Sequence, residues 1–401
     1  MIVHPRTVCA VMIGALLLSM PGHALARIKL ITLPVRERVE IQLDHPNVTL
    51  VEEQRIVPLV QGENQIDFSW ANTRIDPETI VFRVLGPADE DDADMQVNVL
   101  SVSYPPNENA LVWQVSSNAA GAARVRISYV LGNLDKSFHY RAVAANDEQT
   151  LDLSQYIRVR NFANEAFGST GIWAGFGDRM LRPIGLNETR QMLAEKYDDV
   201  PIRKTYTADL SSFGYIDQPK NKLRVPMHYV LTNDADHNLG QALLPFGKVR
   251  IFQDDGRGTT AFLGEDWGQA TPIDDEMRLY LGVAQDITVV RTIERNEQTR
   301  IVGDLYKRDI VIKYEIENFK DQAVTLDVIE TPSVIRRQMI STRNIDVQWE
   351  LGDQTTFPGG LDEEESEYDK LVFHADLPAR ADDGKAAKQT FFIHLTFTNE
   401  W

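Results

Sequence analysis

Hydrophobic and polar residues alternate with a period of two along most of this 401-residue chain. Successive side chains of a β-strand point to opposite faces, so this period is typical of strands with one buried and one solvated face. The clearest case is the segment 309–317, where Ile310, Ile312, Tyr314 and Ile316 alternate with mainly charged residues. The pattern predicts an all-β protein.

The same alternation places further strands on both sides of recognisable turns. Val39–Leu43 and Val48–Val51 flank a turn at Asp44–Asn47 and predict a hairpin, and Phe391–Phe397 predicts a last strand. The stretch Leu244–Asp286 contains three short alternating segments separated by turns. One of these turns is Asp254–Gly258, where glycine supplies positive φ and aspartate bonds its own backbone.

Helical patterns are scarce in the chain. Asn187–Lys196 combines good helix formers with an N-cap residue at Asn187, and predicts one short helix between strands.

The strand-rich N-terminal part gives way to longer loops between Asp135 and Asn146. We therefore predict two linked antiparallel β-sandwich-like domains, at residues 27–140 and 141–401.

The N-terminus has the features of an export signal. A short region with Arg6 precedes an apolar run, and small residues at Ala24 and Ala26 predict cleavage after residue 26. We expect residues 1–26 to be a signal peptide and the protein to be periplasmic or secreted. An uncleaved membrane anchor is the weaker reading, and no later segment predicts a transmembrane span. Cys9, the only cysteine, lies inside this signal, which excludes disulfides and thiol catalysis after cleavage.

The net charge of the chain is −18, and such a surface repels nucleic acid and anionic lipid. Nucleic acid is therefore not expected as a partner. The chain contains no G-x-S-x-G nucleophile motif and no phosphate-binding P-loop. Glu265 and Asp266, beside Trp267, could be taken for a glycosidase carboxylate pair, but adjacent residues of a strand point to opposite faces. We expect no enzymatic activity and no cofactor.

Two acidic runs, 89–94 and 362–367, could collect oxygen ligands around calcium. Neither has the spacing or the glycine of an EF-hand loop, so solvated hairpin loops are favoured and calcium binding stays open. The six histidines beyond the signal show no i, i+2 or i, i+4 spacing, so no metal site is predicted from them. His394, within the last strand, is expected to face outward.

Aromatic residues gather in the glycine-rich segment Ala166–Gly177, which lacks alternation. It is either a flexible loop that presents its rings to a partner or a glycan, or part of the core between two sandwiches. Burial is favoured because large aromatic side chains usually lie inside. Phe167, Trp173 and Phe176 are the candidate binding residues.

A series of short runs in the C-terminal part carries a resemblance to a known family. They are Pro245–Phe252, Phe262–Asp266, Thr271–Pro272, Leu281–Asp286 and Tyr314–Asn318 with Val324–Leu326. In order and spacing these runs resemble the bacterial domain-of-unknown-function family 4139. The departures are Phe162–Phe167, where the family has an acidic-aromatic run, Gln285, where it often has Phe, and the lack of a preceding coiled coil. The resemblance implies an envelope β-protein connected with surface assembly or surface polysaccharide.

Together these features predict an exported, non-enzymatic structural or protein-interaction module of the bacterial cell envelope. Its expected partner is an envelope protein or a surface glycan. The alternative is a glycan-binding protein or carbohydrate-active enzyme of the cell surface. Two carboxyl groups facing each other across an aromatic-lined cleft would favour that alternative.

Overall fold

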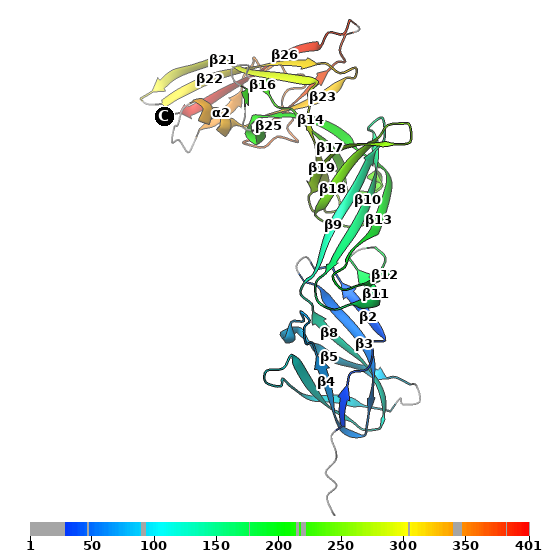
Figure 1. Cartoon of the computed structure of the whole chain (residues 1–401). Coiled ribbons are helices and arrows are strands. Elements are labelled where there is room, and N and C mark those ends of the chain that lie inside the picture. Colours follow the sequence, from blue (N-terminus) through cyan, green and yellow to red (C-terminus); the bar gives the residue numbers. More distant parts are fainter. Residues whose placement is uncertain are drawn as a thin grey trace, which may run out of the picture. The chain divides into compact units, whose positions relative to one another are not determined.

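The computed structural model describes residues 29–45, 48–89, 94–175, 177–213, 216–217, 222–303, 305–339, 347–381 and 383–400 (Figure 1). The chain is all-β, as predicted. It divides into two compact units. Of the described residues, unit 1 comprises those up to Asn133 with 163–172 and 181–186, and unit 2 comprises those in the ranges 134–162, 173–180 and 187–400. The predicted signal peptide lies outside the described residues, and the predicted domain boundary after residue 140 lies within a strand of unit 2.

Unit 1 contains a four-stranded sheet in the order β1-β4-β7-β6 and a six-stranded sheet in the order β12-β11-β2-β3-β8-β5. The first sheet consists of β1 (Lys29–Thr32), β4 (Gly62–Ser69), β7 (Ala110–Ser117) and β6 (Val97–Ser103). The second consists of β12 (Met180–Ile184), β11 (Phe167–Trp173), β2 (Arg38–Gln42), β3 (Leu50–Leu59), β8 (Gly121–Val130) and β5 (Val81–Pro87). A short 3-10 helix, η1, spans Pro77–Thr79.

The two sheets of unit 1 share a core of inward-facing residues. Phe68 of β4 contacts Trp113 of the same sheet and Tyr129 of the other, with ring centroids 5.7 and 6.0 Å apart. All three are buried. The predicted hairpin is confirmed, because β2 and β3 pair in antiparallel fashion. Unit 1 is therefore a β-sandwich.

Unit 2 contains three sheets. The first has the order β13-β10-β9-β18-β19, the middle sheet β20-β17-β14-β23-β25, and the third β15-β16-β21-β22-β26-β24. The first consists of β13 (Thr189–Pro201), β10 (Thr150–Asn161), β9 (Leu134–Ala144), β18 (Gly247–Asp254) and β19 (Thr260–Gly268). The middle sheet consists of β20 (Glu276–Val283), β17 (Pro226–Thr232), β14 (Arg203–Asp209), β23 (Val324–Glu330) and β25 (Leu371–Leu377). The third consists of β15 (Ile216–Asp217), β16 (Lys222–Leu223), β21 (Ile287–Val302), β22 (Leu305–Asn318), β26 (Ala387–Glu400) and β24 (Gln348–Leu351).

The middle sheet contributes to two cores. Tyr229 and Leu279, from β17 and β20, belong to one core with residues of the first sheet such as Leu153. Leu326 and Phe373, from β23 and β25, belong to the other core with residues of the third sheet. The predicted strands at 310–316 and 391–397 supply buried side chains to this second core, which confirms both strands.

The helix predicted at Asn187–Lys196 was wrong, because this segment is strand β13. β13 pairs along its length with β10, and its residues Met192 and Tyr197 are buried. Asn187 has a φ of +53°, which suits a turn and not a helix N-cap. Pairing with a neighbouring strand has overridden helix propensity here. Besides η1, the helices of the described chain are the single turn α1 (Leu210–Phe213), α2 (Pro332–Met339) and the 3-10 helix η3 (Ala235–His237).

The turns in Leu244–Asp286 follow the prediction, and its three strands belong to two different sheets. β18 and β19 form a hairpin whose turn contains Gly256 and Gly258 at φ of +68° and +88°. Asp255 Oδ1 accepts backbone hydrogen bonds from Arg257 and Thr259. The third segment, β20, pairs with β17 in the middle sheet. Within the described part of the chain, β1 with β4, β9 with β18, and β14 with β23 are parallel, and these pairs depart from the predicted antiparallel layout.

Candidate functional site

Strand β6 is an outer strand of the four-stranded sheet in unit 1, and its residues 98–103 are all exposed. Val99 and Val102 lie opposite Val115 and Trp113 of β7 across a bulge. Directly paired residues share a face of the sheet, and both β7 partners are buried, so the two valines belong to the inner face. Each is nevertheless 46% exposed. The apolar inner face of the sheet therefore extends beyond the part that the other sheet covers.

The sequence of β6, VNVLSVS, contains no charged residue. Every other outer strand in the described part of the chain carries at least one, as in β13 and β19, and β5 and β12 also contain proline. Charges and prolines on outer strands normally prevent pairing with another chain. β6 lacks these protective features.

The candidate aromatic residues lie partly in a strand. Residues 167–173 form strand β11, and not the flexible loop that was the less favoured alternative. Phe167 is buried beneath the guanidinium group of Arg36, whose carbon lies 5.8 Å from the ring centroid. Trp173 is partly exposed at the other end of the strand, and Phe176 lies outside the described residues. A binding role for these rings stays a prediction.

A different aromatic pair is exposed on unit 2. Phe246 and Trp267 stack with ring centroids 5.2 Å apart and an interplanar angle of 2°. Glu265, beside Trp267, forms an ion pair with Lys248, whereas Asp266 accepts backbone N–H groups of Trp267 and Tyr280. The two adjacent carboxylates are held by different partners, in agreement with the argument that they cannot act as a pair.

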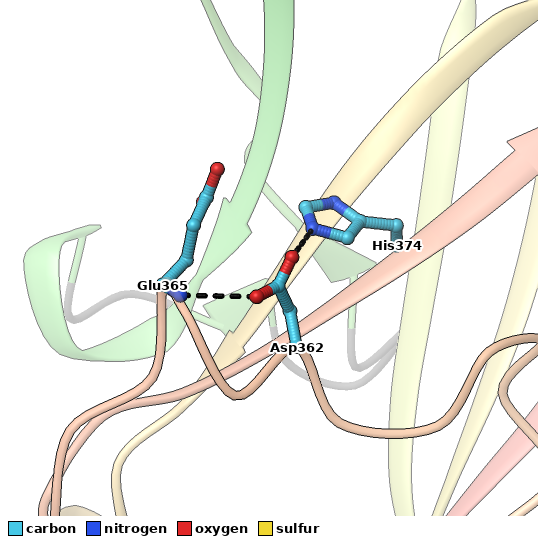
Figure 2. A group of neighbouring side chains, drawn as sticks. All are labelled: Asp362, Glu365 and His374. Atoms are coloured by element: carbon cyan, nitrogen blue, oxygen red, sulfur yellow. Dashed lines mark hydrogen bonds and ion pairs between the residues drawn. The ribbon is translucent and has the colours of Figure 1, made fainter.

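An acidic loop and a histidine meet in unit 2. The loop residues Asp362 and Glu365 come from the predicted acidic run, and His374 comes from β25 (Figure 2). Each of the three offers one ligand atom, and these atoms all lie within 4.8 Å of one another. Asp362 Oδ1 accepts the backbone N–H of Glu365 at 3.0 Å, which holds the loop, while Asp362 Oδ2 lies 3.0 Å from His374 Nε2.

The second nitrogen of the same imidazole is also engaged. His374 Nδ1 lies 3.0 Å from Oδ1 of Asp327, the residue directly opposite it on β23. Burial raises the pKa of Asp327 above its ordinary value. For His374, burial alone would lower the pKa, but the hydrogen bonds to Asp362 and Asp327 outweigh it. The pKa of His374 therefore lies above its ordinary value. Without another ligand, the two carboxylates therefore favour the cationic form of the ring.

A cavity of about 450 Å³ lies beside this cluster, and His374 and Asp327 are part of its lining. On another part of its wall, Lys204 Nζ bonds both carboxylate oxygens of Glu148 at 2.6 and 2.8 Å. Glu148 also accepts the hydroxyl hydrogen of the buried Tyr229. The cavity thus contains both cationic and anionic groups and suits a polar ligand.

Sequence reasoning found the acidic run 362–367 but not its histidine. His374 is separated from Asp362 by twelve positions, and its alternation with buried Phe373 and Ala375 indicates only a strand. His394, expected to face outward, is buried, and its Nε2 lies 3.5 Å from Asp309. Of the other acidic run, residues 90–93 lie outside the described residues.

Neither the comparison with protein-family models nor that with curated proteins finds a match. The resemblance to domain-of-unknown-function family 4139 therefore rests on the quoted residues alone and stays a prediction. Among the described residues, no helix has both the length and the apolar character needed to cross a membrane.

Proposed function

We propose that this protein is an exported, non-enzymatic interaction module of the bacterial cell envelope, and that it binds a partner protein by pairing an added strand with β6. The observation that carries this proposal is the exposed, uncharged edge of β6. An outer strand presents a row of unpaired backbone N–H and C=O groups, and an extended segment of another protein can bond to them.

The side chains of β6 add an apolar contribution to this pairing. A partner strand would cover Val99 and Val102, which continue the inner face of the sandwich. Complete burial of a valine side chain contributes about 1.5–3 kcal/mol, so covering a half-exposed valine contributes roughly 1 kcal/mol. Alternate apolar residues on the partner would be preferred, because successive side chains of a strand face opposite ways.

Two predictions from the sequence support the envelope location. Residues 1–26 have the pattern of a cleaved export signal, and the C-terminal part resembles an envelope-associated family. A net charge of −18 disfavours nucleic acid and anionic lipid as partners. An envelope protein with an extended apolar segment fits these properties.

The test compares the mature protein with a Val99→Lys/Val102→Lys variant. Each protein is used to capture partners from envelope extract, and a captured protein is then purified and mixed with the mature chain for hydrogen exchange. We expect slower exchange in residues 97–103 of the complex and at least tenfold weaker binding by the double variant. The control is Leu193→Lys, which places lysine at a half-exposed apolar position on another outer strand.

Two results would contradict the proposal. One is binding that the double variant retains in full. The other is protection from exchange that occurs elsewhere while residues 97–103 stay unchanged. Circular dichroism of the double variant shows whether any lost binding reflects unfolding, which is not expected because both side chains are already half exposed.

The stacked pair of Phe246 and Trp267 favours glycan binding as a second candidate function. Exposed aromatic rings can stack on the apolar face of a sugar ring, and both rings are about half exposed. Nζ of Lys248 lies over the Trp267 ring, 5.1 Å from its centroid, and supplies a polar group at the same place. Calorimetric titration with soluble envelope oligosaccharides tests this function. Binding should disappear in Phe246→Ala and persist in Phe319→Ala, which removes an exposed ring elsewhere on unit 2.

A further inference from the structure

One face of the middle sheet is polar beside the acidic loop. Thr207 of β14 lies opposite Asp327 of β23, which lies opposite His374 of β25. Paired residues share a face, so these three side chains form a row across the sheet. The neighbouring residues Leu326 and Phe373 are on the other face and belong to the core. Polar groups on three strands are thus brought to the place where the loop carries Asp362 and Glu365.

Two buried hydroxyl groups on this polar face lack a bonding partner. Thr205 and Thr207 are only 4% and 7% exposed, and neither Oγ1 has a hydrogen-bond partner among the described residues. Thr205 also contributes to the lining of the cavity that His374 and Asp327 line. A buried hydroxyl without a partner costs about 1–3 kcal/mol, so water or a bound ligand would stabilise these two groups.

We propose that Asp362, Glu365 and His374 bind a divalent transition-metal ion, with Zn²⁺ as the best-fitting member of that class. This inference concerns unit 2 and does not depend on the proposed function of β6. Nε2 of His374 and Oδ2 of Asp362 are 3.0 Å apart, close to the ligand separation of about 3.3 Å in a tetrahedral zinc site. The metal would replace the proton that these two atoms share.

The remaining ligands need little rearrangement. Glu365 is exposed, and its carboxylate can reach an ion between His374 and Asp362 by a change of rotamer, because all three ligand atoms already lie within 4.8 Å. Figure 2 shows the three side chains, with Asp362 joined to both His374 and the backbone of Glu365. Water would complete the coordination and could bond to nearby hydroxyl groups.

Asp327 has the role of a positioning residue. A metal-binding histidine usually donates its other ring N–H to a carboxylate, which sets the tautomer and orients the ring. Asp327 Oδ1 lies 3.0 Å from His374 Nδ1 and meets this requirement. The imidazole ligand also decides the class of metal. Calcium takes six to eight oxygen ligands, whereas zinc readily combines imidazole nitrogen with carboxylate oxygen.

The test titrates Zn²⁺ into the untagged mature protein after EDTA treatment, with a chromophoric chelator as competitor. We expect the His374 site to take up one equivalent of zinc. His374→Ala should weaken binding more than about 100-fold, and Asp327→Asn by about 10–100-fold, because it removes only the orienting carboxylate. Glu365→Gln changes an exposed side chain, should fold normally, and should also weaken binding.

The matched control is His237→Ala. His237 pairs with Asp234 at 2.7 Å and is similarly exposed, but it belongs to no cluster of three ligands in the described chain. Its loss should leave zinc affinity unchanged. The proposal is overturned if the wild-type protein takes up no zinc, or if Glu365→Gln and His374→Ala bind as tightly as wild type. Calcium binding that depends on Asp362 but not on His374 would overturn the assigned class of metal.

Discussion

The buried pair of Arg291 and Glu330 allows a quantitative test of the unit 2 core. Both side chains are 2% exposed, and Nε and Nη2 of Arg291 lie 2.6 and 3.1 Å from the two carboxylate oxygens. Tyr314 donates its hydroxyl hydrogen to the same carboxylate. Glu330→Ala would remove this carboxylate from a guanidinium group and a hydroxyl that remain buried.

We expect Glu330→Ala to lower the free energy of unfolding of unit 2 by about 3–5 kcal/mol, which is typical when one partner of a buried pair is removed. The loss of the Tyr314 bond is part of this figure, because the three groups act together. For a unit of this size, the change corresponds to a lower melting temperature by roughly 6–20 °C. The double variant Arg291→Met/Glu330→Leu should lose much less stability, because it removes both charges.

Scanning calorimetry of the whole chain measures the effect, with urea unfolding followed by tryptophan fluorescence as a second method. The control is Asp321→Ala, which breaks a two-bond pair with Arg380 at an exposed position. Exposed pairs contribute about 0–1 kcal/mol, so the control should change little. A loss below about 1 kcal/mol in Glu330→Ala, or a double variant no more stable than the single one, would refute the reasoning.

Two further predictions concern the effect of glycine substitutions on stability and the pH dependence of the stability that Asp255 contributes. Gly247→Ala should destabilise unit 2 by about 1–3 kcal/mol in urea unfolding, because its Cβ would lie 2.5 Å from the backbone oxygen of Phe138. Gly168→Ala, with no atom within 4 Å, should change unit 1 by less than about 0.5 kcal/mol, and equal losses would contradict this account. The hydroxyl of Thr259, followed by backbone N–H groups, lowers the pKa of Asp255 below its ordinary value of 3.8. The advantage of wild type over Asp255→Asn in melting temperature should therefore be complete only well above the ordinary pKa of 3.8, and should shrink as the pH falls through the lowered pKa. An advantage that grows as the pH falls would contradict this prediction.

The local pattern of the chain was sufficient for the strands and several turns. The segments at 310–316 and 391–397 form strands with the predicted buried face, and Asp254–Gly258 forms the predicted turn. These features depend on neighbouring residues, because side-chain period and turn geometry are properties of a few consecutive positions. The same information cannot show which strands become neighbours. Asn187–Lys196 is an example, because its residues form a strand by pairing with β10, which the local pattern does not reveal.

The sequence also indicated where the acidic ligands lie, but not what completes their cluster. Asp362 and Glu365 belong to a visible acidic run, whereas His374 and Asp327 resemble ordinary strand residues. The register between β23 and β25 sets Asp327 opposite His374, and the fold of the loop brings Asp362 to the other ring nitrogen. Such contacts depend on strand register. A shift of one residue in the pairing of a strand would turn all its side chains to the opposite face of the sheet.

The sequence by itself determined the all-β class, because a period of two reports a strand without reference to its partners. The sequence also shows directly that the segment forming β6 contains no charged residue. Only the tertiary structure decided that this segment is an outer strand with Val99 and Val102 exposed. The physical reason is that exposure of a strand depends on the sheets around it, which are built from residues far away in the sequence.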